Sequence, residues 1–227
     1  MFGKNKIFGV DNNEKLGVVN IFFTIQGEGP FCGMPAIFIR LGGCNLACKF
    51  CDTEFDEFSY MTNEAILEQC QQKRMSANFK LLVVITGGEP MRQNINRLCD
   101  LLIQDNFMVQ IETNGTINRK LDPEVKIVYS PKPSLNGYST PDSLWLERVE
   151  AIKILISTTH KYYDDIPLWL YKSLQNQPID LADKVILQPI DEYSQEQNAA
   201  NLRLAIHLSH KYNLRLGIQL HKIIGVE

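Results

Sequence analysis

The chain has 227 residues, a length that fits one α/β domain, and 44% of them are hydrophobic, enough for a sizeable core. No apolar stretch approaches the roughly 20 residues that a membrane-spanning helix needs. The 23 basic and 26 acidic residues form no run of one sign, which argues against nucleic acid or a membrane as a partner.

Residues 1–17 are polar and lack the apolar region of a signal peptide, so we expect a cytoplasmic protein. In that reducing compartment the six cysteines are expected to be thiols or metal ligands. Cys70 and Cys99 fall on the apolar faces of predicted helices and are interpreted as small buried hydrophobic residues. Since nothing resembles a linker, we expect a single domain over residues 1–227.

Apolar runs that predict strands alternate with helical patterns along the chain. Strands are predicted over residues 36–41, 81–86, 107–112, 125–130, 149–156, 184–188 and 214–220. Helices are predicted over 63–72, 93–104, 163–174 and from Ser194 to about Tyr212, with Thr62 and Ser194 as N-caps, while 131–141 is a loop. This order predicts an α/β fold, a partial, open (β/α) barrel of about six or seven mainly parallel strands.

Three cysteines form a C-x3-C-x2-C run at Cys44, Cys48 and Cys51. Three thiolates can hold three corners of a four-iron cluster and leave the fourth iron open for chemistry. The alternative is a closed zinc site with Cys32 as the fourth ligand. A disulfide framework is disfavoured because nothing in the chain indicates secretion.

Four other motifs follow predicted strands directly, as the cysteine run does. They are TGGEP at 86–90, ETNG at 112–115, SPK at 130–132 and QPID at 188–191. Each alone is compatible with a tight turn or a helix cap. Because the carboxyl ends of parallel strands meet at one edge of a sheet, we expect all five segments to form one site there.

These residues resemble the radical S-adenosylmethionine (SAM) superfamily. Its C-x3-C-x-Φ-C motif, with an aromatic Φ, matches Cys44, Cys48, Phe50 and Cys51, and its GGE motif matches Gly87-Gly88-Glu89. Within the superfamily the chain is most similar to the members that make 7-deazapurines in the queuosine pathway. That resemblance lies in residues 22–29, 33–40, 51–53, 86–90, 111–115, 130–132, 187–189 and 221–222.

The resemblance implies a carbon–nitrogen lyase with three cofactors: a [4Fe-4S] cluster, SAM and Mg²⁺. It implies the substrate 6-carboxy-5,6,7,8-tetrahydropterin, which would lose a hydrogen to a 5′-deoxyadenosyl radical, contract its ring and release ammonia to give 7-carboxy-7-deazaguanine. It also implies a reducing partner such as flavodoxin or ferredoxin, and a homodimer.

The resemblance further implies a set of site residues. Cys44, Cys48 and Cys51 would bind the cluster, and Thr53 would bind Mg²⁺. The cofactor-binding residues would be Phe50, Cys51, Asp52, Gly88, Glu112, Ser130, Pro131, Lys132, Gln188, Pro189, Ile190 and Asp191. The substrate would meet Ile25, Gln26, Gly27, Arg40 and Thr86, with the Arg40 guanidinium suited to its carboxylate.

Two other functions remain open at this point. One is a radical SAM activase acting on a protein, which would not need Arg40 and Thr53 around a small carboxylate. The other is a non-enzymatic zinc module with Cys32 as its fourth ligand. Taken singly, Arg40 is compatible with a surface residue and Thr53 with a cap or turn.

Overall fold

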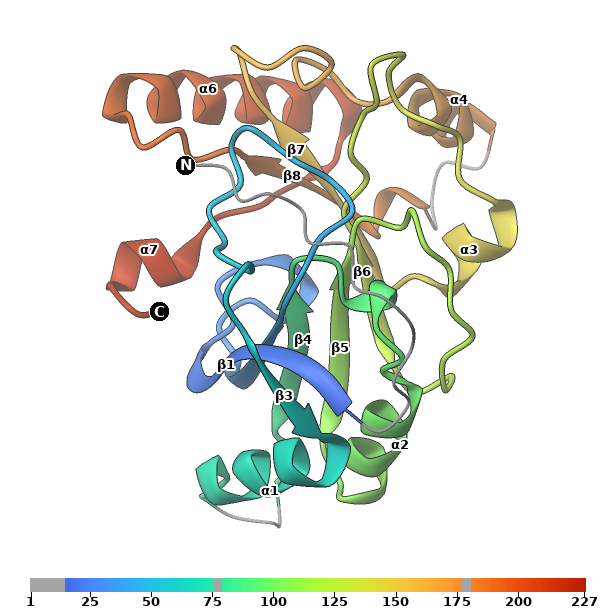
Figure 1. The fold of residues 1–227 in the computed structure, drawn as a ribbon. Coiled ribbons are helices and arrows are strands. Elements are labelled where there is room, and N and C mark those ends of the chain that lie inside the picture. Colours follow the sequence, from blue (N-terminus) through green and yellow to red (C-terminus); the bar gives the residue numbers. More distant parts are fainter. Residues whose placement is uncertain (1–14, 76–78, 177–180) are drawn as a thin grey trace.

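The computed structural model describes residues 15–75, 79–176 and 181–227. Its centre is one nine-stranded sheet in the order β3-β1-β2-β4-β5-β6-β7-β8-β9 (Figure 1). The strands are β1 (Lys15–Ile25), β2 (Pro35–Leu41), β3 (Ser59–Thr62), β4 (Leu82–Gly87), β5 (Met108–Thr113), β6 (Lys126–Tyr129), β7 (Ala151–Ile156), β8 (Val185–Pro189) and β9 (Arg215–Leu216).

The α-helices are α1 (Asn63–Lys73), α2 (Asn96–Gln104), α3 (Ser143–Arg148), α4 (Leu168–Asn176), α6 (Gln195–Tyr212) and α7 (Leu220–Ile224). Short 3-10 helices cover Gly29–Phe31 and Pro90–Arg92. Figure 1 shows α1 and α2 side by side near one end of the sheet and α6 next to β7 and β8 near the other, while α7 leads to the C-terminus.

The seven consecutive strands β2, β4, β5, β6, β7, β8 and β9 of the sheet pair in parallel, which confirms the predicted open α/β fold. Two strands were not predicted: β1 pairs antiparallel with β2, and β3 pairs antiparallel with β1. These two extend the seven parallel strands to nine.

Side chains alternate between the two faces of each strand, and the alternation separates the core from the site. Val83 and Ile85 of β4 belong to the main core, which also includes Ile66 of α1 and Leu98 of α2. The opposite, inner face carries small apolar clusters, such as Ala36 with Leu82 and Val84, at the amino-terminal ends of the strands. The inner positions nearer the carboxyl ends are polar, and they form the site described below.

Two helix starts confirm the predicted caps. Thr62 accepts a hydrogen bond from the backbone N–H of Ala65, and Ser194 accepts one from Gln197. The helix predicted over 163–174 begins instead at Leu168, directly after Pro167. Proline disrupts the interior of a helix and is tolerated only in its first turn, so the helix cannot extend back through Pro167. Cys70 and Cys99 are buried, as predicted.

Two other predicted elements have different bounds. The helix predicted over 93–104 begins at Asn96, because the Gln93 amide is engaged by the carbonyls of Gly17 and Gly42. The strand predicted over 214–220 is wrong beyond Leu216: the chain leaves the sheet there and α7 begins at Leu220.

The signal-peptide prediction concerns mainly residues 1–14, which lie outside the described residues. Within the described ranges no helix combines the length and the apolar character needed to cross a membrane.

Candidate active site

Polar side chains from five strands meet on the inner face toward the carboxyl end of the sheet. They are Arg40 of β2, Thr86 of β4, Glu112 of β5, Lys153 of β7 and Gln188 of β8. They line two adjoining cavities, which we call the cysteine cavity and the arginine cavity. Glu28, Asp52, Thr53, Thr86, Glu112 and Lys153 line both, so the two cavities share a wall.

The cysteine cavity brings together nearly all the residues predicted to bind the cluster and SAM. Its lining includes Cys44, Cys48, Phe50, Cys51, Asp52, Gly88, Glu112, Ser130, Lys132, Gln188, Pro189, Ile190 and Asp191. Pro131 differs, because it lines neither cavity. All five strand-end segments therefore contribute residues to one cavity.

The segment after β2 that carries Cys44, Cys48 and Cys51, which we call the cysteine loop, is held against the segment after β4 by hydrogen bonds to its backbone carbonyls. The N–H of Glu89 donates to the carbonyl of Gly43 at 2.9 Å, and Arg92 donates to the carbonyl of Cys44 at 2.9 Å. A Cβ on Gly88 would lie 1.9 Å from the Gly43 carbonyl oxygen. Glycine at this position thus permits a close approach to the cysteine loop itself.

The Glu89 carboxylate joins the GGE and ETNG motifs. It is almost fully buried and accepts hydrogen bonds from the backbone N–H groups of Met91 and Asn114 and from the Thr113 hydroxyl. Burial raises the pKa of Glu89, and these hydrogen bonds oppose the rise. The Asn114 amide in turn donates to the Asn45 side chain at 3.1 Å, which fixes the cysteine loop from a second side.

The aromatic residue of the cysteine motif packs against the segment that follows β7. The Phe50 ring centroid lies 5.1 Å from that of His160 and 5.2 Å from that of Tyr163. His160 is itself 3.1 Å from the Glu192 carboxylate. Phe50 therefore anchors the loop between Cys48 and Cys51 by ring packing.

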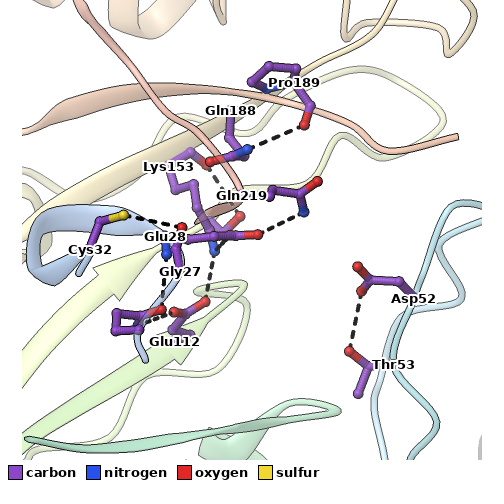
Figure 2. Close-up of polar contacts among 12 residues, drawn as sticks. Gly27, Glu28, Cys32, Asp52, Thr53, Glu112, Lys153, Gln188, Pro189 and Gln219 are labelled. Atoms are coloured by element: carbon purple, nitrogen blue, oxygen red, sulfur yellow. Dashed lines mark hydrogen bonds and ion pairs between the residues drawn. The ribbon is translucent and has the colours of Figure 1, made fainter. Parts of the chain in front are cut away.

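Three thiols of one cavity fit a four-iron cluster, and the fourth candidate ligand lies elsewhere. Cys32 is exposed, and its Sγ lies 3.3 Å from the carbonyl of Gly27 (Figure 2). It lines neither cavity. Among the described residues, no three His, Cys, Asp or Glu side chains converge on one point as ligands of a single ion. A cluster binds each thiolate through a different iron, so its ligands need not converge in that way.

Burial raises the pKa of Cys44, Cys48 and Cys51. In the metal-free protein these thiols would keep their protons at neutral pH. Iron supplies the positive charge that stabilises the thiolates, so metal binding and proton release are linked.

The arginine cavity brings together all five residues predicted to meet the substrate: Ile25, Gln26, Gly27, Arg40 and Thr86. The Arg40 guanidinium lies 5.2 Å from the Phe22 ring centroid and 3.8 Å from the Glu227 carboxylate. Within the described ranges its buried Nε has no hydrogen-bond partner. Arg40 therefore has donor capacity left for an anionic ligand.

A buried ion triad lies in the wall between the cavities. Lys153 Nζ is 2.6 Å from Glu28 Oε2 and 2.8 Å from Glu112 Oε2 (Figure 2). Gln219 donates to the other oxygen of Glu28, and Gln26 donates to the other oxygen of Glu112. The triad thus joins the segment after β1 to strands β5 and β7 with every carboxylate oxygen hydrogen-bonded.

The attraction within the triad outweighs the cost of burying charge. Burial alone would raise the pKa of Glu28, but the charge and hydrogen bond of Lys153 lower it to about 2. Burial alone would lower the pKa of Lys153, and the two carboxylates raise it instead. Two carboxylates and one ammonium leave a net charge of about −1 at the shared wall.

A second lysine faces the cysteines. Lys132 Nζ donates to the carbonyl and the hydroxyl of Ser130 at 2.8 and 2.7 Å. Burial lowers its pKa to about 8. The SPK motif therefore places a cation of reduced basicity beside Cys48.

Thr53 lines both cavities, and its hydroxyl lies 3.4 Å from Asp52 Oδ1. These oxygens are hard ligands of the kind that Mg²⁺ accepts, and Mg²⁺ usually keeps several waters beside one or two protein ligands. The position is compatible with the predicted Mg²⁺ ligand.

Sequence analysis missed three residues of the site: Glu28 and Lys153 of the shared wall, and Gln219 of the cysteine cavity. Glu28 lies inside the quoted 22–29 segment but received no role, and Gln219 was assigned to a strand. Lys153 interrupts an otherwise apolar strand, and a lysine in such a strand is a signal that could have been used.

Comparison with known proteins identifies the chain. Residues 38–127 match the family model of the radical SAM superfamily. The chain is 44% identical to a 7-carboxy-7-deazaguanine synthase of Rickettsia prowazekii, with 100% of this chain and 96% of the relative covered. It is 34% identical to the synthase of that name from Rhodospirillum rubrum, with both chains fully covered.

A solved structure agrees. The crystal structure of QueE from Escherichia coli superposes with a TM-score of 0.72 and 31% identity, covering 91% of this chain and 95% of that one. The chain belongs to the 7-carboxy-7-deazaguanine synthase family. Membership confirms the predicted radical SAM fold and lyase type, and with them the [4Fe-4S] cluster and SAM as cofactors.

Proposed function

We propose that this chain converts 6-carboxy-5,6,7,8-tetrahydropterin to 7-carboxy-7-deazaguanine and ammonia, in 7-deazapurine (queuosine) biosynthesis. The observation that carries the proposal is the pair of adjoining cavities with a shared wall. One holds the three thiols of the cluster motif, and the other holds a partly buried arginine whose Nε has no hydrogen-bond partner in the described residues. Relatives of nearly the same length that bear the synthase name support it.

When bound, the cluster and SAM supply a 5′-deoxyadenosyl radical that abstracts a hydrogen from the substrate. The protein binds, orients and shields. Cys44, Cys48 and Cys51 would hold the iron, and the close contact of Gly88 with Gly43 keeps their loop against the sheet. The remaining residues of the cysteine cavity, including Ser130 and Lys132, would hold SAM.

In the arginine cavity, Arg40 would bind the carboxylate of the substrate through its planar fork, and Thr86 would hydrogen-bond the substrate from the shared wall. Ile25, Gln26 and Gly27 would meet the pterin ring through backbone and amide groups. Thr53 would hold a Mg²⁺ ion, which would supply positive charge beside the substrate. The reaction itself needs no net oxidant, since the atoms of the substrate equal those of the product plus ammonia.

The test is anaerobic reconstitution with iron and sulfide, followed by product analysis with the pterin, SAM, Mg²⁺ and a reductant. We expect 7-carboxy-7-deazaguanine from the wild type and a marked rise in the KM for the pterin in Arg40→Met. A brown protein with about four irons per chain that leaves the pterin unchanged would favour an activase. A colourless protein with one zinc would favour the zinc module.

We also propose a reductant, an assembly and a location. The reductant is a flavodoxin or ferredoxin, the assembly is a homodimer, and the location is the cytoplasm. The reductant and the homodimer follow from the family resemblance. The location follows from the composition of the chain and from its six cysteines, none of which forms a disulfide in the described residues.

A further inference from the structure

The C-terminal segment docks on the substrate side of the site. The backbone N–H of Leu220 donates to the carbonyl of Gly27 at 2.9 Å, and the Gln219 side chain donates to Glu28 at 2.8 Å. A Cβ on Gly27 would lie 2.0 Å from the His221 ring, so only glycine allows this packing. The start of α7 is thereby fixed against the 25–28 segment.

Lys222, one residue further on, reaches across the mouth of the site. Its Nζ lies 2.6 Å from Asp191 Oδ2 and 3.4 Å from Asp52 Oδ2, and 5.6 Å from the centroid of the Tyr193 ring. Asp191 follows β8 and Asp52 follows the last cysteine of the motif. One ammonium group thus ties together α7, the loop after β8 and the cysteine loop.

The two carboxylates differ in how firmly they are held. Asp191 also accepts hydrogen bonds from the Asn198 amide at 2.6 Å and from the Tyr193 N–H at 2.9 Å, and its side chain is 16% exposed. Asp52 is 44% exposed, and its contact with Lys222 is longer. We call the contacts of Lys222 with Asp191, Asp52 and Tyr193 the bridge. The Lys222–Asp191 pair is its fixed end, and Asp52 is the end that can shift.

The bridge lies on the border between the two cavities. Asp191 and Asp52 line the cysteine cavity, while Asp52, Lys222 and Tyr193 line the arginine cavity. Each cavity is therefore lined by at least one member of the bridge. None of the roles proposed above uses Lys222.

We propose that Lys222 is a positioning residue that couples the two sites, so that SAM in the cysteine cavity and the pterin in the arginine cavity bind more tightly together than alone. The inference rests on the proposed function, because it takes these two molecules as the ligands. Coupling between two sites is reciprocal, so each ligand must raise the affinity of the other by the same factor.

The experiment measures equilibrium binding to the reconstituted, anaerobic protein without reductant, so that neither ligand is consumed. The Kd of the pterin is determined with and without saturating SAM, and the Kd of SAM with and without the pterin. We expect a coupling factor of about fivefold or more in the wild type, the lower end of typical values. Lys222→Met is expected to reduce it to near one, and Lys222→Arg to restore part of it.

Lys211→Met is the matched control. Lys211 also pairs with an aspartate, Asp165 at 3.0 Å, and also lies over a tyrosine ring, that of Tyr212. It lines neither cavity. Lys211→Met should therefore keep the wild-type coupling factor. Asp191→Asn, which removes the fixed end of the bridge, should behave as Lys222→Met does.

The outcomes are distinct. A wild-type coupling factor that survives in Lys222→Met with unchanged iron content would overturn the role of Lys222 and leave the proposed function intact. The same follows if both ligands bind the wild type independently. A wild type that binds SAM but shows no affinity for the pterin would overturn the proposed function, and the coupling with it.

Discussion

Replacing Lys153 by methionine should destabilise the protein strongly, and more at pH 8 than at pH 5. The Lys153 side chain is 8% exposed and those of Glu28 and Glu112 are 16% and 17% exposed. Removing one partner of a buried ion pair costs roughly 3–5 kcal/mol, because the remaining charge is left buried without compensation. For a chain of this size that corresponds to a fall of roughly 6–20 °C in the melting temperature.

The pH dependence follows from the direction of each shift. The pKa of Glu28 is about 2 in the folded protein and 4.5 ordinarily, so its stabilising contribution is complete above pH 4.5 and is lost as the pH falls toward 2. The pKa of Lys153 is raised, so its contribution is complete below 10.5 and is lost only above that. The wild-type triad is therefore intact at both pH 5 and pH 8.

In Lys153→Met the two carboxylates face each other without a cation, and a proton taken up by one of them relieves the repulsion. Proton uptake is easier at pH 5, so the loss of stability is smaller there. The measurement is thermal unfolding followed by circular dichroism at both pH values, on anaerobic samples with equal iron content.

Lys126→Met is the control for this prediction. Lys126 pairs with Glu150 at 3.1 Å, but the two side chains are 40% and 37% exposed. An exposed pair contributes at most about 1 kcal/mol, so the melting temperature should fall by less than about 4 °C. If Lys153→Met melts no lower than Lys126→Met, the triad does not stabilise the fold as argued.

Four other substitutions test the site. Cys48→Ser should lose the cluster, whereas Cys32→Ser should keep about four irons per chain by metal analysis, and equal loss in both would refute the open iron site. Thr53→Ala should lower turnover and abolish stimulation by Mg²⁺ with the cluster spectrum unchanged; an unaltered Mg²⁺ dependence would exclude the ligand role. Gly88→Ala should reduce iron incorporation, because its Cβ would lie 1.9 Å from the Gly43 carbonyl oxygen, and a normal iron content would contradict that packing argument.

The position of the site could be predicted because it depends on local patterns. An apolar run followed directly by glycine, proline and polar residues marks the end of a parallel strand, and all such ends face one edge of the sheet. Glu89 and Asn114 illustrate the result, since they join two of these loops. The strand β1 could not be found in this way, because its register depends on pairing with β2 and shifts between Val18 and Asn20.

Lys153 could have been found from the alternation of its strand. Ile152, Ile154 and Ile156 belong to the main core, so the residues between them point to the inner face. A charge at such a position is stable only if it is paired, and Glu112 occupies the inner face of another strand in the same sheet. The contribution of Gln219 and Lys222 was beyond sequence analysis, because the five-residue helix α7 is fixed by tertiary contacts to the 25–28 segment.

The shared wall explains why this fold suits a hydrogen transfer between two bound molecules. Such a transfer requires the reacting atoms to approach within roughly 3–3.5 Å, and the protein must hold both molecules there before reaction. Thr86 and Glu112 line both cavities, so the two cavities meet at these side chains. The rigidity of that wall comes from Lys153, which ties Glu112 to Glu28 across the sheet. The buried triad thus fixes the orientation of the Glu28 and Glu112 carboxylates in the wall. An apolar wall of equal stability would offer no polar group in a fixed orientation to either cavity.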